Sequence, residues 1–191
     1  MTPSISVVVP TYNEAANVPT FYHGLAGALA GRTWELVVVD DDSPDGTAQA
    51  VRELGRQHDN VRCIQRVQER GLCSAVHWGV QAAHGEVIVV MDGDLQHEPA
   101  LIPQMLDMLQ NGHDIVSGSR FLEGTEVSGL PSDLRRRLSD YGNRLTNRFL
   151  GKELSDPLTG FFATTRRLFL ESIPSMQADG FKVFFDLVYH N

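Results

Sequence analysis

Three side chains with oxygen ligands, Asp92, Asp94 and Gln96, stand at alternate positions where an apolar run ends. That run, Glu86–Asp92, suits a strand buried in a parallel sheet, and the carboxyl ends of such strands are where open α/β sheets bind ligands. Asp-x-Asp spacing lets two carboxylates converge on one divalent cation. Mg²⁺ or Mn²⁺ held by one or two carboxylates usually bridges to substrate phosphates. We therefore expect a metal site at Asp92, Asp94 and Gln96, which we call the acidic triplet.

Two earlier apolar runs also end in polar side chains. The run Ile5–Pro10 leads into Thr11-Tyr12-Asn13-Glu14, and the run Trp34–Asp40 leads into Asp41. A carboxylate at the tip of a strand can hydrogen-bond a ribose or the edge of a base. An ordinary strand order would place Asp40 and Asp41 on the strand next to the acidic triplet, where they could serve nucleotide binding.

The residues after Asp41 are typical of a turn before a helix. Asp and Ser are common helix N-caps, and Ser43-Pro44-Asp45-Gly46 fits a type I or type II turn. We therefore interpret Asp42, Ser43, Asp45 and Gly46 as structural residues rather than as ligands.

Strand and helix signals alternate along the chain and would position these residues. Runs rich in Val and Ile predict strands at Ile5–Pro10, Trp34–Asp40, Val61–Gln65, Glu86–Asp92 and Asp114–Gly118. Amphipathic periodicity predicts helices at Asn17–Ala30, Gly46–His58, Leu72–His84, Pro99–Asn111 and Asp133–Leu150. This alternation indicates an α/β fold with a mostly parallel sheet and helices on both faces. The segment Glu123–Ser132, rich in Gly, Pro and small polar residues, predicts a long loop of the kind that forms active-site lids.

The composition limits the class of protein. A chain of 191 residues, 42% hydrophobic and 21% charged, fits one globular domain over residues 1–191. The net charge of −8 argues against a general nucleic-acid binder. Cys63 and Cys73, without a Cys-x-x-Cys pair, give no disulfide framework or zinc signature, so a reducing compartment is expected. We interpret Cys73 as a packing residue.

The sequence offers no cleavable leader and no run of about 18 apolar residues that could span a bilayer. Any membrane contact is therefore expected to be peripheral. The last segment, residues 180–191, is aromatic and amphipathic and stops without a cap or a polar tail, so we expect the natural chain to continue. Its aromatic side chains, Phe181, Phe184, Phe185 and Tyr189, are expected to serve the core rather than a lipid surface.

Six motifs of the chain together resemble the glycosyltransferase family 2 enzymes, in the branch of dolichol-phosphate mannose synthases and polyprenyl-phosphate glycosyltransferases. They occur in the family's order and cover nearly the whole chain. The motifs are Tyr12-Asn13-Glu14, the segment 40–47, Arg70-Gly71-Leu72, the segment 91–99, Gly118-Ser119-Arg120-Phe121 and the segment 156–161.

The resemblance implies a GT-A fold and a Mg²⁺- or Mn²⁺-dependent, inverting transfer of a hexose. The sugar would move from a nucleotide-diphosphate sugar, of the GDP-mannose or UDP-glucose type, to a polyprenyl or dolichyl phosphate. The implied location is the cytoplasm, at the inner face of the cell membrane, and a peripheral membrane surface is an implied partner. Nucleic acid is not an expected partner, and the oligomeric state stays open.

The resemblance also implies roles for single residues. It implies that the base and ribose are held by Pro10, Tyr12, Glu14, Val38 and Asp40. The acidic triplet would hold the metal and the diphosphate, with Asp94 in a catalytic role. Arg120, Arg135 and Ser139 would engage the acceptor phosphate or the phosphates of the donor sugar. Within Arg135-Arg136-Arg137, Arg135 is chosen because it lies four residues before Ser139.

The chemistry of the acceptor supports these roles. Arginine binds phosphate through a planar fork, which suits Arg120 and Arg135. A phosphomonoester is largely dianionic at neutral pH, with a second pKa of about 6, and needs no general base. Transferases that act on a sugar hydroxyl need a carboxylate base instead. The segment Thr159–Arg166 has no acidic pair and Asp156 is the only acid near it, which favours a phosphate acceptor.

Other interpretations stay open at this point. The same fold could act on a saccharide hydroxyl, with Asp156 or an acid of Glu123–Ser132 as base. A binding module could hold a nucleotide sugar without turning it over. A nucleotidyltransferase would need a glycine-rich, lysine-bearing phosphate loop, which Pro10–Glu14 lacks. His97 either supports the acidic triplet or is a solvated or helix-capping residue. The base and the sugar also stay open.

Overall fold

A computed structural model of the chain describes residues 3–118, 159–176 and 182–191. Within these residues, six strands form one sheet in the order β3-β2-β1-β4-β6-β5. The strands are β1 (Ile5–Thr11), β2 (Trp34–Asp40), β3 (Val61–Gln65), β4 (Val87–Val90), β5 (Ile115–Ser117) and β6 (Phe162–Thr165). Strands β1 to β4 pair in parallel, whereas β6 runs antiparallel to both of its neighbours. The expected mostly parallel sheet is confirmed.

The central strands align their carboxyl ends. All seven residues of β1 are buried, as expected for a parallel strand covered on both faces. Thr11 pairs with Asp40 across β1 and β2, and Val8 pairs with Val90 across β1 and β4. The ends of these three strands therefore lie along one edge. The expectation that β2 would neighbour the strand before the acidic triplet is wrong, because β1 lies between them.

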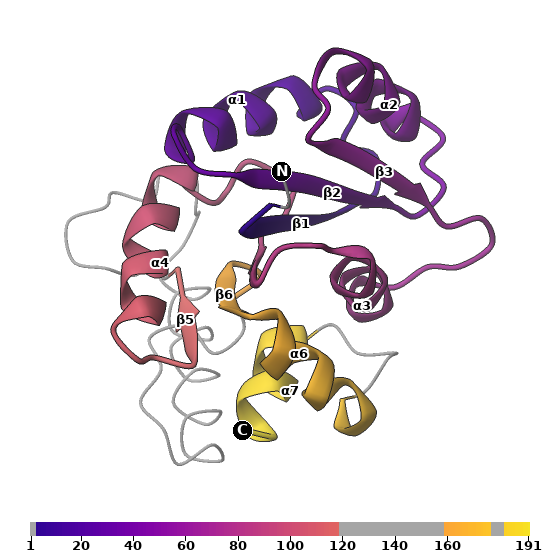
Figure 1. The fold of residues 1–191 in the computed structure, drawn as a ribbon. Coiled ribbons are helices and arrows are strands. Elements are labelled where there is room, and N and C mark those ends of the chain that lie inside the picture. The colour runs from indigo at the N-terminus through magenta and orange to yellow at the C-terminus, as the bar shows by residue number, and fades with distance from the viewer. Residues whose placement is uncertain (1–2, 119–158, 177–181) are drawn as a thin grey trace, which may run out of the picture.

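Helices cover both faces of the sheet (Figure 1). One core layer contains side chains of α1, α2 and α4, and the other contains side chains of α3, α6 and α7. The helices are α1 (Val18–Ala28), α2 (Thr47–Gln57), α3 (Leu72–Ala82), α4 (Ile102–Gln110), α6 (Arg166–Ser172) and α7 (Val183–Tyr189). Short 3₁₀ turns at Pro99–Leu101 and Ile173–Ser175 precede α4 and follow α6.

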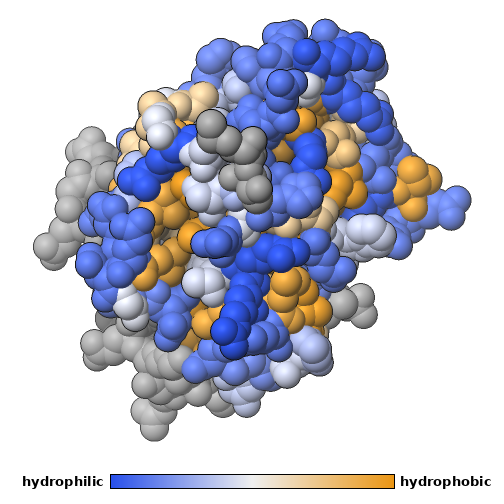
Figure 2. Space-filling model, viewed as in Figure 1, coloured by the Kyte–Doolittle hydropathy of each residue, from blue (hydrophilic) through white to orange (hydrophobic). Residues whose placement is uncertain are grey.

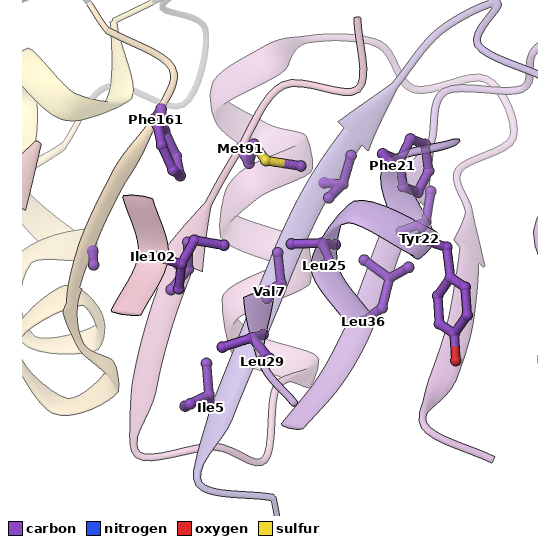
Figure 3. Close-up of a cluster of buried hydrophobic side chains, with 14 of the residues drawn as sticks. Ile5, Val7, Phe21, Tyr22, Leu25, Leu29, Leu36, Met91, Ile102 and Phe161 are labelled. Atoms are coloured by element: carbon purple, nitrogen blue, oxygen red, sulfur yellow. The ribbon is translucent and has the colours of Figure 1, made fainter. Parts of the chain in front are cut away.

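The first core layer anchors the edge at which polar residues gather. Leu25 on α1 is fully buried and points towards the sheet residues Val7 and Leu36 (Figure 3). Met91 and Phe161 belong to the same cluster, so it reaches the residues that flank Asp92 and Gly160. On the face shown in Figure 2, hydrophilic residues predominate and hydrophobic ones form separate smaller patches. The apolar side chains of this layer thus hold the strand ends in place.

The carboxyl-terminal third differs from the expected pattern. Phe162–Thr165 forms a strand that the sequence did not predict, because it is short and its first three residues, buried between β4 and β5, show no alternation of polar and apolar side chains. Phe184 packs in the core, with its ring centroid 5.4 Å from that of Phe162, so its expected core role is confirmed. Tyr189 is instead 61% exposed. Cys73 is buried in the core, as expected.

Several expected features lie outside the described residues. They are the helix Asp133–Leu150, the loop Glu123–Ser132, and Phe181. Within the described residues, no helix has the length and apolar character needed to cross a membrane.

His77 on α3 makes the stability of this packing dependent on pH. Burial lowers the pKa of His77, and nearby Asp186 raises it to a smaller extent. The His77 imidazole therefore binds a proton more readily in the unfolded chain than in the folded one. The stability that the neutral, buried His77 contributes is complete above about pH 6.5 and is lost as the pH falls towards the lowered pKa. Urea unfolding measured at about pH 7.5 and at about pH 5.5 should show that the free energy of unfolding falls more for the wild type than for His77→Leu. Equal losses would contradict this role.

Candidate functional site

Polar side chains gather where β1, β2 and β4 end. Asp40, at the tip of β2, is fully buried, and its carboxylate accepts hydrogen bonds from the Ser43 backbone N–H (3.0 Å), the Ser43 hydroxyl and the Thr11 hydroxyl. Pro10 and Val38 are also buried, one on each of the two paired strands. Val38 packs in the first core layer, and the loops that follow β1 and β2 begin directly after Thr11 and Asp40.

The loop after β2 is tied to the loop after β1. Asp45 accepts from the hydroxyl (2.6 Å) and backbone N–H (3.0 Å) of Thr47, and its other oxygen accepts from the Ala15 backbone N–H at 3.0 Å. The hydrogen bond from Thr47 is the largest cause of a lowered pKa at Asp45. Gly46, with φ of 89°, begins helix α2 in the left-handed region that favours glycine. The interpretation of this segment as a turn is confirmed.

A buried ion pair fixes the loop after β3. Arg66 donates two hydrogen bonds to Asp41 Oδ1, one from Nε at 2.7 Å and one from Nη2. Both side chains are almost completely buried. The same guanidinium donates to the Ser74 hydroxyl at 2.8 Å and to the Gly71 carbonyl at 2.9 Å. Asp41 Oδ2 accepts from the Gly71 backbone N–H at 2.9 Å. The pair therefore joins the end of β2 to the start of α3.

That loop carries a cation to an exposed aromatic ring. The Arg70 guanidinium carbon lies 4.6 Å from the centroid of the Tyr12 ring, and Tyr12 is 44% exposed. Glu14, two residues after Tyr12, is half-buried and accepts a hydrogen bond from the Asn17 side chain. An exposed ring beside a cation offers a flat surface on which a nucleobase can stack.

The acidic triplet follows β4 and faces the same edge. Asp94 and Gln96 are exposed, and Asp94 Oδ1 accepts from the Gln96 backbone N–H at 3.0 Å. Asp92 is partly exposed, and its Oδ2 lies 3.1 Å from His97 Nε2. His97 itself is buried, so its interpretation as a solvated residue is wrong and its placement beside the triplet is confirmed. A Cβ built on Gly93, between the two aspartates, would lie 3.1 Å from Thr11 Cγ2 and 3.6 Å from Glu14 Cγ.

Sequence reasoning missed two residues of this edge. Arg66 directly follows β3, and that position at a strand end was the signal that could have identified it. Gly160 lies against the carboxylate of Asp92, a contact that no local pattern marks. Asp92, Gly160 and six other residues line a small cavity of about 70 Å³. Arg120, Arg135, Ser139 and Asp156 lie outside the described residues.

The edge can therefore serve two chemical purposes. Tyr12 and Glu14 present an aromatic face and a carboxylate that suit a base and a ribose. The acidic triplet presents hard oxygen atoms that suit a divalent cation beside phosphates. Gly93 lies close to Thr11 and Glu14, so these two parts are neighbours along the edge.

Comparison with known proteins gives a consistent family. Residues 6–172 match the family described as Glycosyl transferase family 2. The chain is 39% identical over 187 residues to a dolichol-phosphate mannosyltransferase of Pyrococcus furiosus, covering 96% of this chain and 52% of that protein. It is 35% identical over 191 residues to a dolichol-phosphate mannosyltransferase of Saccharomyces cerevisiae, covering 96% of this chain and 69% of that protein. The chain thus spans from about half to about two thirds of the length of these relatives.

A solved structure supports the same arrangement of elements. The glucosyl-3-phosphoglycerate synthase of Mycobacterium tuberculosis, in complex with Mn²⁺, uridine diphosphate and phosphoglyceric acid, superimposes with a TM-score of 0.72 at 23% identity. The match covers 97% of this chain and 62% of that one. At this identity the likeness shows the fold alone, and the expected GT-A fold is confirmed.

Proposed function

Because this chain belongs to glycosyl transferase family 2, we propose that it transfers a hexose from a nucleotide-diphosphate sugar to a polyprenyl or dolichyl phosphate. The observation that carries the proposal is the closeness of Gly93 to Thr11 and Glu14, because it sets the acidic triplet beside the loop that we propose binds the nucleotide. A diphosphate that joins a nucleoside to a sugar has to reach from one of these parts to the other.

The nucleotide would lie across the ends of β1 and β2. Tyr12 and Glu14, which are accessible, would contact the base and ribose, and the buried residues Pro10, Val38 and Asp40 would complete the nucleotide site at the strand ends. The loops that carry them are held by Asp45 and by the Asp41–Arg66 pair. Because these loops are already held in place, binding of the nucleotide loses less conformational entropy.

The acidic triplet has the ligand chemistry that Mg²⁺ or Mn²⁺ requires. Two carboxylates and an amide oxygen are hard ligands. Within the described residues, no group of three or more His, Cys, Asp or Glu side chains is placed to hold a metal ion, so the site proposed here has only two carboxylates and would be completed by the amide and the phosphates. Asp92 and Asp94 would hold the cation together with the phosphates of the donor sugar, and Gln96 would add its amide oxygen. When bound, the cation would neutralise charge that develops on the departing nucleoside diphosphate.

The acceptor would be a phosphate that attacks without a general base. Its dianionic oxygen would approach the anomeric carbon from the face opposite the nucleoside diphosphate, so the configuration inverts. Arg120, Arg135 and Ser139, outside the described residues, are proposed to hold this phosphate or the donor's phosphates. Both relatives carry the name dolichol-phosphate mannosyltransferase, which supports a lipid phosphate as the acceptor. We place the reaction in the cytoplasm, at the inner face of the cell membrane, where a lipid-linked phosphate is accessible to a peripheral protein.

A transfer assay tests the proposal as a whole. The chain is incubated with Mn²⁺ or Mg²⁺, with GDP-mannose or UDP-glucose, and with a polyprenyl phosphate in detergent. We expect one of the donors to give a glycosylated lipid phosphate, and EDTA to abolish the product. Transfer to free saccharides without transfer to polyprenyl phosphate would overturn the lipid acceptor. Binding of nucleotide with Mn²⁺, in the absence of transfer and hydrolysis, would identify a binding module instead.

Tyr12 provides a sharper test of the nucleotide site. Stacking of a base on an aromatic ring contributes about 1–3 kcal/mol, so Tyr12→Leu should weaken nucleoside diphosphate binding roughly 5- to 150-fold. Tyr12→Phe keeps the ring and should bind almost as the wild type does. Isothermal titration with GDP and UDP in the presence of Mn²⁺ measures both variants. Tyr189→Leu, at an exposed tyrosine of α7, is the matched control. Unchanged affinity in Tyr12→Leu would remove this residue from the site.

A further inference from the structure

We propose that His97 and Gly160 position Asp92 for binding the cation. The imidazole of His97 holds one oxygen of the Asp92 carboxylate, and the missing side chain of Gly160 leaves the space that this carboxylate occupies. The inference rests on the proposed metal site and identifies the residues that set the orientation of one of its ligands.

The position of the His97 ring is fixed by its packing. Its side chain is 2% exposed, and its ring centroid lies 5.2 Å from that of Phe161. Phe161 is itself buried in the core. A ring that is enclosed in this way cannot follow Asp92 to another rotamer, so the carboxylate has to adapt to the ring.

The contact between the two side chains has a defined direction. His97 Nε2 lies 3.1 Å from Asp92 Oδ2, and we assign the donor role to Nε2 and the acceptor role to the carboxylate oxygen. Within the described residues, the buried Nδ1 atom of His97 has no hydrogen-bond partner, so Asp92 is the one polar group of this part of the chain to which the ring donates. The Asp92 side chain is still 33% exposed and keeps lone pairs available to a ligand.

Gly160 forms the opposite wall. A Cβ added to this residue would lie 2.1 Å from Asp92 Oδ2 and 2.5 Å from Oδ1, and its three nearest neighbours would all be atoms of that carboxyl group. Gly160 is not among the glycines with positive φ, so its backbone conformation admits alanine. Gly160→Ala should therefore displace the carboxylate rather than strain the backbone.

The two residues act on Asp92 and not on the substrate. Ligating carboxylates are oriented by hydrogen bonds from behind, and loss of such a partner typically weakens metal binding 10- to 100-fold. We therefore expect the replacement of His97 or of Gly160 to affect the affinity for the cation more strongly than it affects the stability of the fold.

The first experiment measures Mn²⁺ affinity by electron paramagnetic resonance of the free ion, with saturating nucleoside diphosphate. His97→Leu removes the N–H donor and should weaken Mn²⁺ binding about 10- to 100-fold. His97→Gln places an N–H donor near the position of Nε2 and should restore part of the loss. His84→Leu is the matched control, because the exposed His84 ring also lies beside a carboxylate, with Nδ1 3.4 Å from Glu35 Oε2. It should bind Mn²⁺ as the wild type does.

The second experiment applies the same titration to Gly160→Ala, which should lose Mn²⁺ affinity to a similar extent. Gly27→Ala is its control, because a Cβ at Gly27 would meet no atom within 4 Å. Thermal unfolding of all variants shows whether the fold is retained.

A metal-free measurement separates this inference from the proposed function. In a long-range ¹H–¹⁵N spectrum, the His97 signals, identified by their absence in His97→Leu, should show the Nε2–H tautomer. The Nδ1–H tautomer would overturn the inference whatever the metal does. If the wild type binds Mn²⁺ and the His97→Leu and Gly160→Ala variants bind it equally well, the inference is overturned and the metal site stands. If the wild type binds no Mn²⁺, the metal site and the inference both fall.

Discussion

Replacement of Asp94 by asparagine is expected to slow glycosyl transfer about 10³-fold. The carboxylate is a proposed ligand of the cation that neutralises the departing diphosphate, and such stabilisation amounts to several kcal/mol, of which about 4 kcal/mol corresponds to that factor. Asn has nearly the same size and shape but no charge. Because Asp94 is exposed and accepts only a backbone hydrogen bond from Gln96 among the described contacts, the fold should be unaffected.

Initial rates at saturating donor and acceptor, over a range of Mn²⁺ concentrations, measure this effect. The matched control is Asp107→Asn, because Asp107 is an exposed acid on α4 with one carboxylate oxygen 4.0 Å from Arg32 Nη2. It should transfer sugar at the wild-type rate. If Asp94→Asn kept more than about a tenth of the wild-type rate, a loss of only about 1.4 kcal/mol, Asp94 would not be a ligand of the catalytic cation.

The second large effect is expected on stability, at the buried pair of Asp41 and Arg66. Removal of one partner of a buried ion pair leaves the other charge without compensation and costs about 3–5 kcal/mol. Arg66→Met should therefore lower the free energy of unfolding by that amount. Asp41→Asn should lower it by less, because the exposed carboxylate of Glu69, with Oε2 3.7 Å from Arg66 Nη1, still lies beside the guanidinium. For a domain of this size the melting temperature should fall by roughly 6–20 °C.

A double-mutant cycle measured by urea unfolding tests this expectation. The double variant Asp41→Asn/Arg66→Met leaves neither charge of the pair. Its loss in free energy of unfolding should therefore be clearly smaller than the sum of the losses in the two single variants. The exposed pair of Glu53 and Arg56 is the control, and Glu53→Gln should cost less than about 1 kcal/mol. Additive losses at positions 41 and 66 would show that the two charges do not act as a pair.

The same variants connect stability to nucleotide binding. Arg66 and Asp41 both hold Gly71, and the loop between Arg66 and Gly71 carries Arg70 over the Tyr12 ring. Loss of the pair should therefore also weaken nucleoside diphosphate binding. Isothermal titration at a temperature where the variants are folded measures this effect.

Much of the architecture followed from local patterns. The runs of β1 to β5 were predicted within a few residues. The central strands β1, β2 and β4 are nearly continuous apolar stretches because both of their faces are covered, whereas the edge strands β3 and β5 were identified from their Val and Ile residues. The helices α1 to α4 followed in the same way from their amphipathic periodicity. The turn at Ser43–Gly46 was predicted because Ser, Pro, Asp and Gly each favour a specific turn conformation.

The order of the strands could not be predicted in this way. The sequence suggested that β2 would neighbour β4, whereas β1 pairs with both of them. Strand β6 was missed because its place in the sheet depends on antiparallel pairing with β4 and β5, which precede it by many residues. Such pairings are decided by how the whole set of apolar faces can be buried, and no local window contains that information.

The sequence by itself determined the family and the acidic triplet, because hard oxygen ligands at alternate positions after a buried strand are a local pattern. Only the tertiary structure decided what surrounds these residues. Arg66 meets Asp41 across 25 positions, and Gly160, just before β6, meets Asp92, just after the paired strand β4. His97 lies close to Asp92 in the chain, but its burial against Phe161 depends on β6. The proposed metal ligands are therefore encoded locally, whereas their orientation depends on long-range packing, because a side chain is held only by the neighbours that folding brings to it.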